Sequence, residues 1–217
     1  MVVVSTHLEC HKHMHNYLVI GAGGTGTHLI PALHRYLTTH HKDTPWRLHI
    51  IDGDIVEGHN LTRQNFGPAD VNQNKAAAAA AALDDTAHVR AITEYLSETN
   101  LARYVKSGDT LFIAADNFTV RRRIEEHALT LSEIVIINGG NEEHAGSVQL
   151  WVRSKARNIT PRIGYLHPEV NALGADRAEM TCTQAAALPG GAQTLLANLH
   201  SATWMLTALW RYHTNRF

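Results

Sequence analysis

Residues 19–29 read VIGAGGTGTHL, and this short stretch indicates how the chain is built. Gly21, Gly23 and Gly26 have the spacing G-x-G-x-x-G and directly follow the apolar run 17–20. Glycine allows a tight turn and a close backbone approach to a phosphate, and a helix that starts there directs its positive end at the same anion. A glycine-rich turn can also be a simple joint between a strand and a helix. With an apolar run before it and a helix-compatible segment after it, the pattern predicts a nucleotide-binding strand, turn and helix.

Short runs of β-branched and aliphatic residues recur along the chain, with longer helix-compatible segments between them. The runs occupy residues 17–20, 48–51, 110–114, 134–137 and 147–152. Runs of four to six residues with few polar interruptions are typical of strands that are buried on both faces. We therefore expect an α/β fold, namely a Rossmann-like, doubly wound and mostly parallel sheet with helices on both faces.

The remaining segments organise around this core as one domain spanning residues 1–217. Seven consecutive alanines follow Lys75, and alanine has the highest helix propensity, so we expect a helix capped by Asn72 or Asn74. Three further segments are predicted: an N-terminal arm at residues 1–16, a long variable crossing loop at residues 154–181 and a C-terminal helix at residues 191–213.

Composition excludes several classes of function. The 19 basic and 20 acidic residues give a formal charge of -1, which is no electrostatic signal for nucleic acid or an anionic membrane. No apolar run approaches the ~20 residues of a membrane span, and the N-terminus lacks the pattern of a signal peptide. Cys10 and Cys182 are too few for a disulfide framework. We expect a cytoplasmic protein without membrane or nucleic-acid partners.

A second motif lies at residues 48–66, which read LHIIDGDIVEGHNLTRQNF. Asp52 ends an apolar run, where an acid can accept hydrogen bonds from the hydroxyls of a ribose. Its alternative role is that of a strand-end aspartate that caps a turn. The polar loop that follows then places Asn60, Arg63 and Gln64 within five residues.

The charges after Asp52 distinguish between nucleotide chemistries. A dinucleotide needs little more than the helix N-terminus, whereas a carboxylate that attacks a triphosphate brings several negative groups together and requires cations. Arg63 and Lys75 supply these cations, and Asp116, after the next buried run, would hold Mg²⁺. Each has a structural alternative: a solvated loop charge, an exposed residue in a first helical turn, and the N-cap of a helix that begins near Asn117.

Together these motifs resemble those of a known family. The glycine turn GAGGTG, the strand-end DGD, the loop NLTRQ, a lysine twelve residues after the arginine, and ADNFTVR occur in this order. They are similar to the adenylation fold of the ThiF and MoeB family and of ubiquitin-activating enzymes. The resemblance spans residues 17–146 and is closest to short ThiF-like members of plasmid or phage gene clusters.

The resemblance implies an ATP- and Mg²⁺-dependent enzyme. It would adenylate the C-terminal carboxylate of a small ubiquitin-like β-grasp protein that ends in Gly-Gly, with release of pyrophosphate, and it would work as a homodimer. Arg63, Lys75 and Asp116 are the implied catalytic residues, with Asp116 at the magnesium. The implied cofactor-binding residues are Gly21, Gly23, Gly24, Gly26, Asp52, Asp54, Asn60, Gln64 and Arg121.

The chain also departs from the family pattern. Paired C-x-x-C motifs are absent, so we expect no structural zinc. Relatives carry an N-terminal arginine, but the first arginine here is Arg35. Cys182 is either an acyl-accepting thiol or a small buried hydrophobic residue. His11, His13 and His15 alternate, which fits a metal site, a polar strand or a disordered arm.

Three other functions remain compatible with the sequence. A nicotinamide-dependent oxidoreductase would use the glycine turn and Asp52 but not Arg63, Lys75 or Asp116. A catalytically silent scaffold would keep the fold and bind the same partner. Adenylation of a small-molecule or tRNA-linked carboxylate is the third, and the neutral net charge disfavours the tRNA version.

Overall fold

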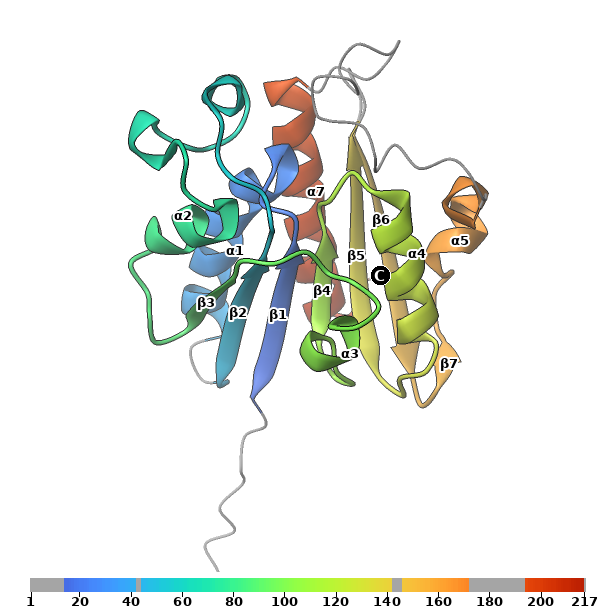
Figure 1. The fold of residues 1–217 in the computed structure, drawn as a ribbon. Coiled ribbons are helices and arrows are strands. Elements are labelled where there is room, and N and C mark those ends of the chain that lie inside the picture. Colours follow the sequence, from blue (N-terminus) through green and yellow to red (C-terminus); the bar gives the residue numbers. More distant parts are fainter. Residues whose placement is uncertain (1–13, 42–43, 142–145, 172–193, 217) are drawn as a thin grey trace, which may run out of the picture.

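A seven-stranded sheet forms the centre of the computed structural model, which describes residues 14–41, 44–141, 146–171 and 194–216 (Figure 1). The strand order is β3-β2-β1-β4-β5-β6-β7. The pairings from β3 through β5 are parallel, and β6 and β7 are antiparallel to their neighbours. The expected mostly parallel α/β sheet is therefore confirmed.

The predicted strands are all present, with ends that differ by a few residues. The sheet consists of β1 (His15–Ile20), β2 (Trp46–Ile51), β3 (Val89–Ile92), β4 (Thr110–Ile113), β5 (Ile134–Asn141), β6 (Gly146–Ser154) and β7 (Arg157–Asn158). Sequence patterning missed β3 and β7. Both lie at the sheet edges, where β3 exposes Arg90 and β7 has only two residues, so neither shows a buried apolar run.

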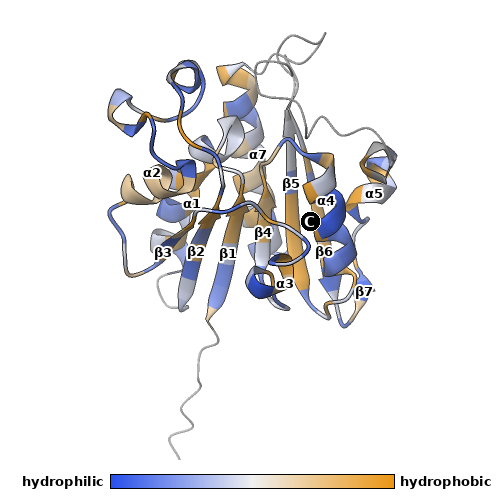
Figure 2. Cartoon of the chain, viewed as in Figure 1, coloured by the Kyte–Doolittle hydropathy of each residue, from blue (hydrophilic) through white to orange (hydrophobic). Residues whose placement is uncertain are grey.

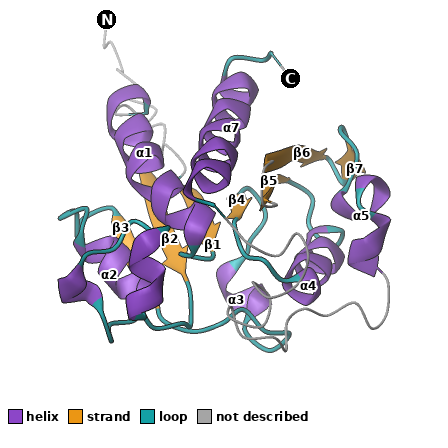
Figure 3. Cartoon of the chain, turned by 90° about the horizontal axis from the view of Figure 1, so that it is seen from above, coloured by secondary structure: helices purple, strands orange, loops and turns teal. Residues whose placement is uncertain are grey.

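Helices cover both faces of the sheet, as Figure 3 shows from above. One face carries α1 (Gly24–His40), α2 (Lys75–Ala81) and α7 (Leu195–His213), and the other carries α3 (Leu101–Tyr104), α4 (Phe118–Ala128) and α5 (Ile163–Leu166). Each layer buries its own apolar core against the strands, which form the most hydrophobic part of the chain in Figure 2. Burial of aliphatic side chains on both faces is what a doubly wound sheet requires.

Local capping determines where the helices begin. The side chain of Asn74 accepts a hydrogen bond from Ala77 N at 3.0 Å, so Asn74, not Asn72, caps the alanine helix α2. In α4 the cap is Asn117, whose Oδ1 accepts from Val120 N at 3.0 Å. The interpretation of Asp116 as a mere helix cap is therefore wrong, because the next residue already performs that role.

The predicted long loop at residues 154–181 is wrong for its described part. Residues 154–171 form the end of β6, then β7, α5 and the 3-10 turn η3 (Pro168–Asn171). The buried carboxylate of Glu125 on α4 holds this segment, because it accepts from Arg162 Nη1 at 2.8 Å and from Gly164 N at 2.6 Å. Residues 172–181 lie outside the described residues.

The C-terminal helix begins later than expected, at Leu195, and only part of its predicted apolar stripe is buried. Ala202, Met205 and Leu209 pack against the sheet, whereas Leu195 and Leu199 are exposed near the start of the helix. Trp204 and Trp210 are exposed as well. None of the helices in the described ranges is long and apolar enough to span a membrane.

A polar cluster ties α1 to the turn before β3. Asp85 accepts hydrogen bonds from His34 Nε2 at 2.8 Å and from His88, whose ring stacks on Trp46 of β2. Burial raises the pKa of the Asp85 carboxyl, but the bonds from His34 and His88 outweigh this effect and lower it to about 2. The carboxylate therefore stabilises the fold only while it is ionised.

We predict that this contribution depends on pH. Because the folded-state pKa lies below the ordinary value of about 4, the stabilisation is complete above pH 4 and is lost as the pH falls toward 2. Asp85→Asn should lower the free energy of unfolding at pH 7 by about 1 kcal/mol, and the gap to the wild type should close toward pH 2. Urea denaturation across this pH range measures both quantities. Asp84→Asn, which changes an exposed neighbouring carboxylate, should leave stability unchanged at both ends of the range.

Candidate active site

The candidate residues gather at the carboxyl ends of the parallel strands, in the loops that follow β1, β2 and β4. The strand order reverses between β1 and β4, because the chain moves outward from β1 in one direction to β2 and β3 and in the other to β4 and β5. Open α/β sheets bind their ligands at such a switch point.

The glycine turn is packed so tightly that most side chains are excluded. Gly21 has φ +95°, and a Cβ built on it would lie 2.8 Å from Ala115 N. A Cβ on Gly26 would lie 1.9 Å from the carbonyl oxygen of Gly21, and one on Gly24 would lie 2.3 Å from Asn198 Nδ2. Gly23 differs, since a Cβ there would meet no described atom within 4 Å. The turn is thus closed by its neighbours except at Gly23, where there is room.

Helix α1 begins directly after Gly23. Gly23 is the N-cap residue and supplies no side-chain acceptor, and the first turn of the helix contains no acidic residue. The amide groups at the start of an α-helix lack intrahelical acceptors and carry partial positive charge. A phosphate beside Gly23 would satisfy them.

Asp52 connects the glycine turn to the loop after β2. Its carboxylate is buried and accepts hydrogen bonds from Ala22 N at 2.6 Å and from Asp54 N at 2.8 Å. Burial raises the pKa of Asp52, and the two backbone donors oppose that rise. The turn-capping interpretation of Asp52 is correct, and it is compatible with a ribose contact because each carboxylate oxygen has two lone pairs.

Lys75 is buried rather than exposed. It begins α2, only 4% of the residue is exposed, and its Nζ donates to Asp54 Oδ2 at 3.0 Å. The other oxygen of Asp54 accepts a hydrogen bond from the Tyr95 hydroxyl. Burial raises the pKa of Asp54, but the bond from Tyr95 and the charge of Lys75 lower it by more. The net shift of this pKa is therefore downward. The structure thus places a buried ammonium and its counter-ion next to Asp52.

The polar loop after β2 contains two buried amide side chains. Asn60, in the 3-10 turn η1 (Gly58–Thr62), is buried, and its Oδ1 accepts from Glu57 N at 3.0 Å. Gln64 is also buried, and its Oε1 has no hydrogen-bond partner within the described part of the chain. A buried acceptor of this kind calls for a donor from a ligand or a water molecule.

Two helices hold the backbone of Arg63. His28 Nε2 on α1 lies 3.2 Å from the carbonyl oxygen of Arg63, and Asn198 Nδ2 on α7 donates to the same oxygen at 3.3 Å. Asn65 N donates to Thr27 Oγ1 at 3.1 Å. Sequence reasoning missed Thr27, His28 and Asn198. The sequence signal that could have revealed this contact is an asparagine, Asn198, on the apolar face of a helix. In the structure its amide is fully buried, and a buried amide requires a hydrogen-bond partner.

Asp116 and Arg121 lie on the far side of the glycine turn. Asp116 is exposed, and it follows Ala115, whose backbone packs against Gly21. Arg121 is buried on α4 and donates to Asn138 Oδ1 at 2.6 Å and to the carbonyl oxygens of Ala115 and Gly139 at 3.0 and 2.7 Å. Arg121 therefore braces the loop that carries Asp116 against the end of β5.

The site fits a magnesium nucleotide. Mg²⁺ usually takes one or two protein carboxylates and completes its shell with phosphate oxygens and water. Asp116, whose carboxylate is exposed and which follows the residue that packs against Gly21, is of the type that would serve as such a ligand. Within the described ranges, no group of three or more His, Cys, Asp or Glu residues is arranged to hold a metal ion. Cys10, His11, His13 and Cys182 lie outside those ranges.

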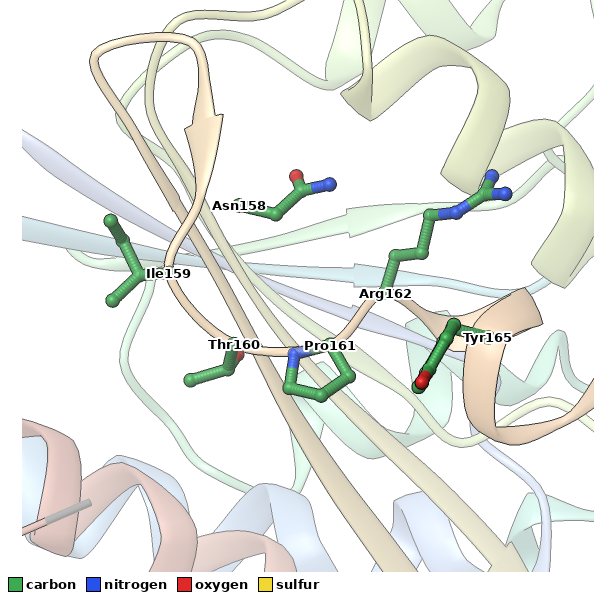
Figure 4. Close-up of a pocket in the computed structure, with 6 residues that line it drawn as sticks. All are labelled: Asn158, Ile159, Thr160, Pro161, Arg162 and Tyr165. Atoms are coloured by element: carbon green, nitrogen blue, oxygen red, sulfur yellow. The ribbon is translucent and has the colours of Figure 1, made fainter.

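A pocket elsewhere on the surface does not involve the candidate residues. It has a volume of about 410 Å³ and lies between β7 and α5 (Figure 4). Its lining consists of Asn158, Ile159, Thr160, Pro161, Arg162 and Tyr165. The one charged residue of this lining is Arg162, whose Nη1 donates to Glu125 at 2.8 Å.

Comparison with known proteins identifies related chains. A family model described as the ThiF family matches residues 9–209. The solved structure of E. coli MccB with ATP is 18% identical, with a TM-score of 0.66 over 93% of this chain and 56% of that chain. The microcin C7 biosynthetic enzyme MccB in complex with N-formylated MccA is 18% identical, with a TM-score of 0.68 over 93% and 58%. PaaA is 21% identical, with a TM-score of 0.61 over 93% and 56%. No curated protein sequence matches the chain.

This chain therefore spans a little over half the length of the solved proteins that it resembles. At identities near 20% the likeness establishes a shared fold.

Two glycine substitutions test how tightly the turn is packed at each position. Gly26→Ala pushes a methyl group into the Gly21 carbonyl, and overpacking of this kind costs about 3 kcal/mol, or about 6–12 °C in Tm for a chain of this size. Gly23→Ala places its methyl group in open space, so it should keep the wild-type Tm within about 2 °C. Thermal unfolding followed by circular dichroism measures both. Equal losses in the two variants would contradict the described turn.

Proposed function

The chain belongs to the ThiF family, and from this we propose that it catalyses the ATP-dependent adenylation of a carboxylate. The observation that supports the proposal is that three charged residues lie in, or directly after, the loops that surround the glycine turn. Lys75 is buried beside Asp52, the Arg63 backbone is fixed against α1 and α7, and Asp116 lies next to the turn on its other side. A nicotinamide enzyme would leave this arrangement without a purpose.

In the proposed reaction, a carboxylate oxygen of the acceptor attacks the α-phosphorus of ATP. A new P–O bond forms, the bond to the bridging oxygen breaks, and pyrophosphate leaves with the electron pair. Attacking group, transferred group and leaving group are all anionic, so the barrier is dominated by charge that must be compensated. Arg63 and Lys75 perform this compensation. The N-terminus of α1 holds a phosphate beside Gly23, and Asp52 accepts from the ribose.

Asp116 would hold Mg²⁺, which supplies further positive charge to the phosphates when it is bound. Arg121 keeps the loop of Asp116 in place through its bonds to Ala115, Asn138 and Gly139. Asn60 maintains the loop of Arg63 through its bond to Glu57, and the buried Oε1 of Gln64 would offer an acceptor to the nucleotide.

For the acceptor we propose the C-terminal carboxylate of a polypeptide. The motif resemblance favours a small ubiquitin-like protein that ends in Gly-Gly. The similarity to MccB, whose structures include one with ATP and one with N-formylated MccA, supports a second candidate, a peptide that is not a β-grasp protein. Both present the same nucleophile, so the same site residues would serve either one.

The assembly we propose is a symmetric homodimer in which α7 takes part. Leu195, Leu196 and Leu199 at the start of this helix are exposed, as are Trp204 and Trp210. Apolar side chains of this size are common where identical chains meet. Light scattering at micromolar concentration should give twice the 24.0 kDa of the single chain. A single species at 24 kDa would contradict the dimer.

The chemical prediction concerns exchange of labelled pyrophosphate into ATP, which measures reversible adenylation directly. Exchange should require both Mg²⁺ and a polypeptide with a free C-terminal carboxylate. Arg63→Ala should reduce it by about 10² or more, the usual loss when a charged group aimed at transition-state charge is removed. Arg157→Ala, which removes an exposed arginine on β7, is the matched control and should leave exchange unchanged. Asp116→Ala should weaken the dependence on Mg²⁺.

Further arms of this assay distinguish the alternatives. Cys182→Ala should leave exchange intact, even if the thiol later accepts the acyl group. Removing the last glycine of a Gly-Gly partner tests the ubiquitin-like class, and a short peptide tests the second class. Tight binding of NAD without binding of ATP, or exchange that is indifferent to Arg63 and Asp116, would refute adenylation.

A further inference from the structure

Tyr95 is an exposed aromatic residue that is nevertheless held in one position. It lies in the loop after β3, 63% of the residue is exposed, and it belongs to neither apolar core of the described chain. Its hydroxyl donates to Asp54 Oδ1. Its ring lies across Gly53, because a Cβ built on Gly53 would be 2.6 Å from Cδ2 and 2.7 Å from Cε2 of the ring. Ordering a solvent-exposed side chain costs conformational entropy, and core packing does not account for it here.

The ring of Tyr95 covers Gly53, which is the residue next to Asp52. Gly53 follows Asp52 directly, so their Cα atoms are about 3.8 Å apart. In a nucleotide the base is joined to the ribose by a single glycosidic bond. A nucleotide whose ribose hydroxyls bond Asp52 carries its base close to this part of the chain, and the exposed ring of Tyr95 lies there, against Gly53.

We propose that the Tyr95 ring is the platform on which the base of the nucleotide stacks. Because Gly53 has no side chain, the ring can fill the space where another residue would project beside Asp52. The Asp54 carboxylate fixes the ring from one side and bonds Lys75 from the other. Asp54 is then a positioning residue, because it fixes the distance between the ring of Tyr95, which holds the base, and the ammonium of Lys75, which faces the phosphates. The inference rests on the proposed nucleotide site and adds the residue that holds its base.

Binding experiments test the platform without a need for turnover. Stacking of a base on an aromatic side chain contributes about 1–3 kcal/mol, so Tyr95→Ala should raise the Kd for ATP by about 5- to 150-fold in calorimetry. Inorganic triphosphate has neither base nor ribose, so its Kd, measured by competition with ATP, should change less than about twofold. Tyr165→Ala removes a similarly exposed tyrosine on α5 and should bind ATP like the wild type.

Tyr95→Phe separates the ring from its hydroxyl. It keeps the stacking surface and removes the bond to Asp54, so its Kd for ATP should stay within about threefold of the wild type. An equal loss in the Phe and Ala variants, or an equal loss of inorganic triphosphate in Tyr95→Ala, would show that the residue acts only by bracing Asp54 and Lys75 and would overturn the platform. Wild-type ATP binding by Tyr95→Ala would overturn it as well.

These outcomes remain distinct from failure of the proposed function. If ATP binding depends on the ring but no carboxylate supports pyrophosphate exchange, adenylation is wrong and the platform stands. If exchange requires Arg63 but ATP binding ignores Tyr95, adenylation stands and the platform is wrong.

Discussion

The rest of the site depends on the hydrogen bonds that the buried carboxylate of Asp52 accepts. An ionised group in the interior is costly unless hydrogen bonds compensate it, and here two backbone amides do so, one from the glycine turn and one from the strand-end loop. The bond from Ala22 N joins the ends of β1 and β2 at a fixed spacing, and the bond from Asp54 N closes the turn after β2. The direction of α1 and the course of the chain toward Asp54 and Lys75 both start from that junction.

The loop of Arg63 is held by contacts with elements that are distant in sequence. The loop of Arg63 rests on Thr27 and His28 of α1 and on Asn198 of α7. Asn198 also lies against Gly24, so the C-terminal helix packs on the glycine turn and on the arginine loop together. α7 is therefore part of the wall of the site as well as a cover for β5 and β6.

The two sides of the site are organised differently. On the side of β2 and α2, opposite charges pair directly, with Lys75 on Asp54. On the side of β4 and α4, the guanidinium of Arg121 donates to oxygens of Ala115, Asn138 and Gly139, and Asp116 lies at the surface. A fixed ammonium on one side and an exposed carboxylate on the other suit a ligand that carries both phosphates and a metal ion.

Much of this followed from residues that are close in sequence. The turn GAGGTG, the acids after residue 51, the loop NLTRQ and the parallel sheet were all readable, because each depends on a short pattern of residue types whose physics is local. The strands β3 and β7 and the ordered segment 154–171 were not readable, since short edge strands and turns carry few apolar residues. The sequence also did not predict that Lys75 is buried against Asp54, that Arg121 braces the loop after β4, or that Asn198 holds the loop of Arg63. These features depend on which side chains are brought together by packing across 17 to 135 positions of sequence, and only the folded chain specifies those contacts.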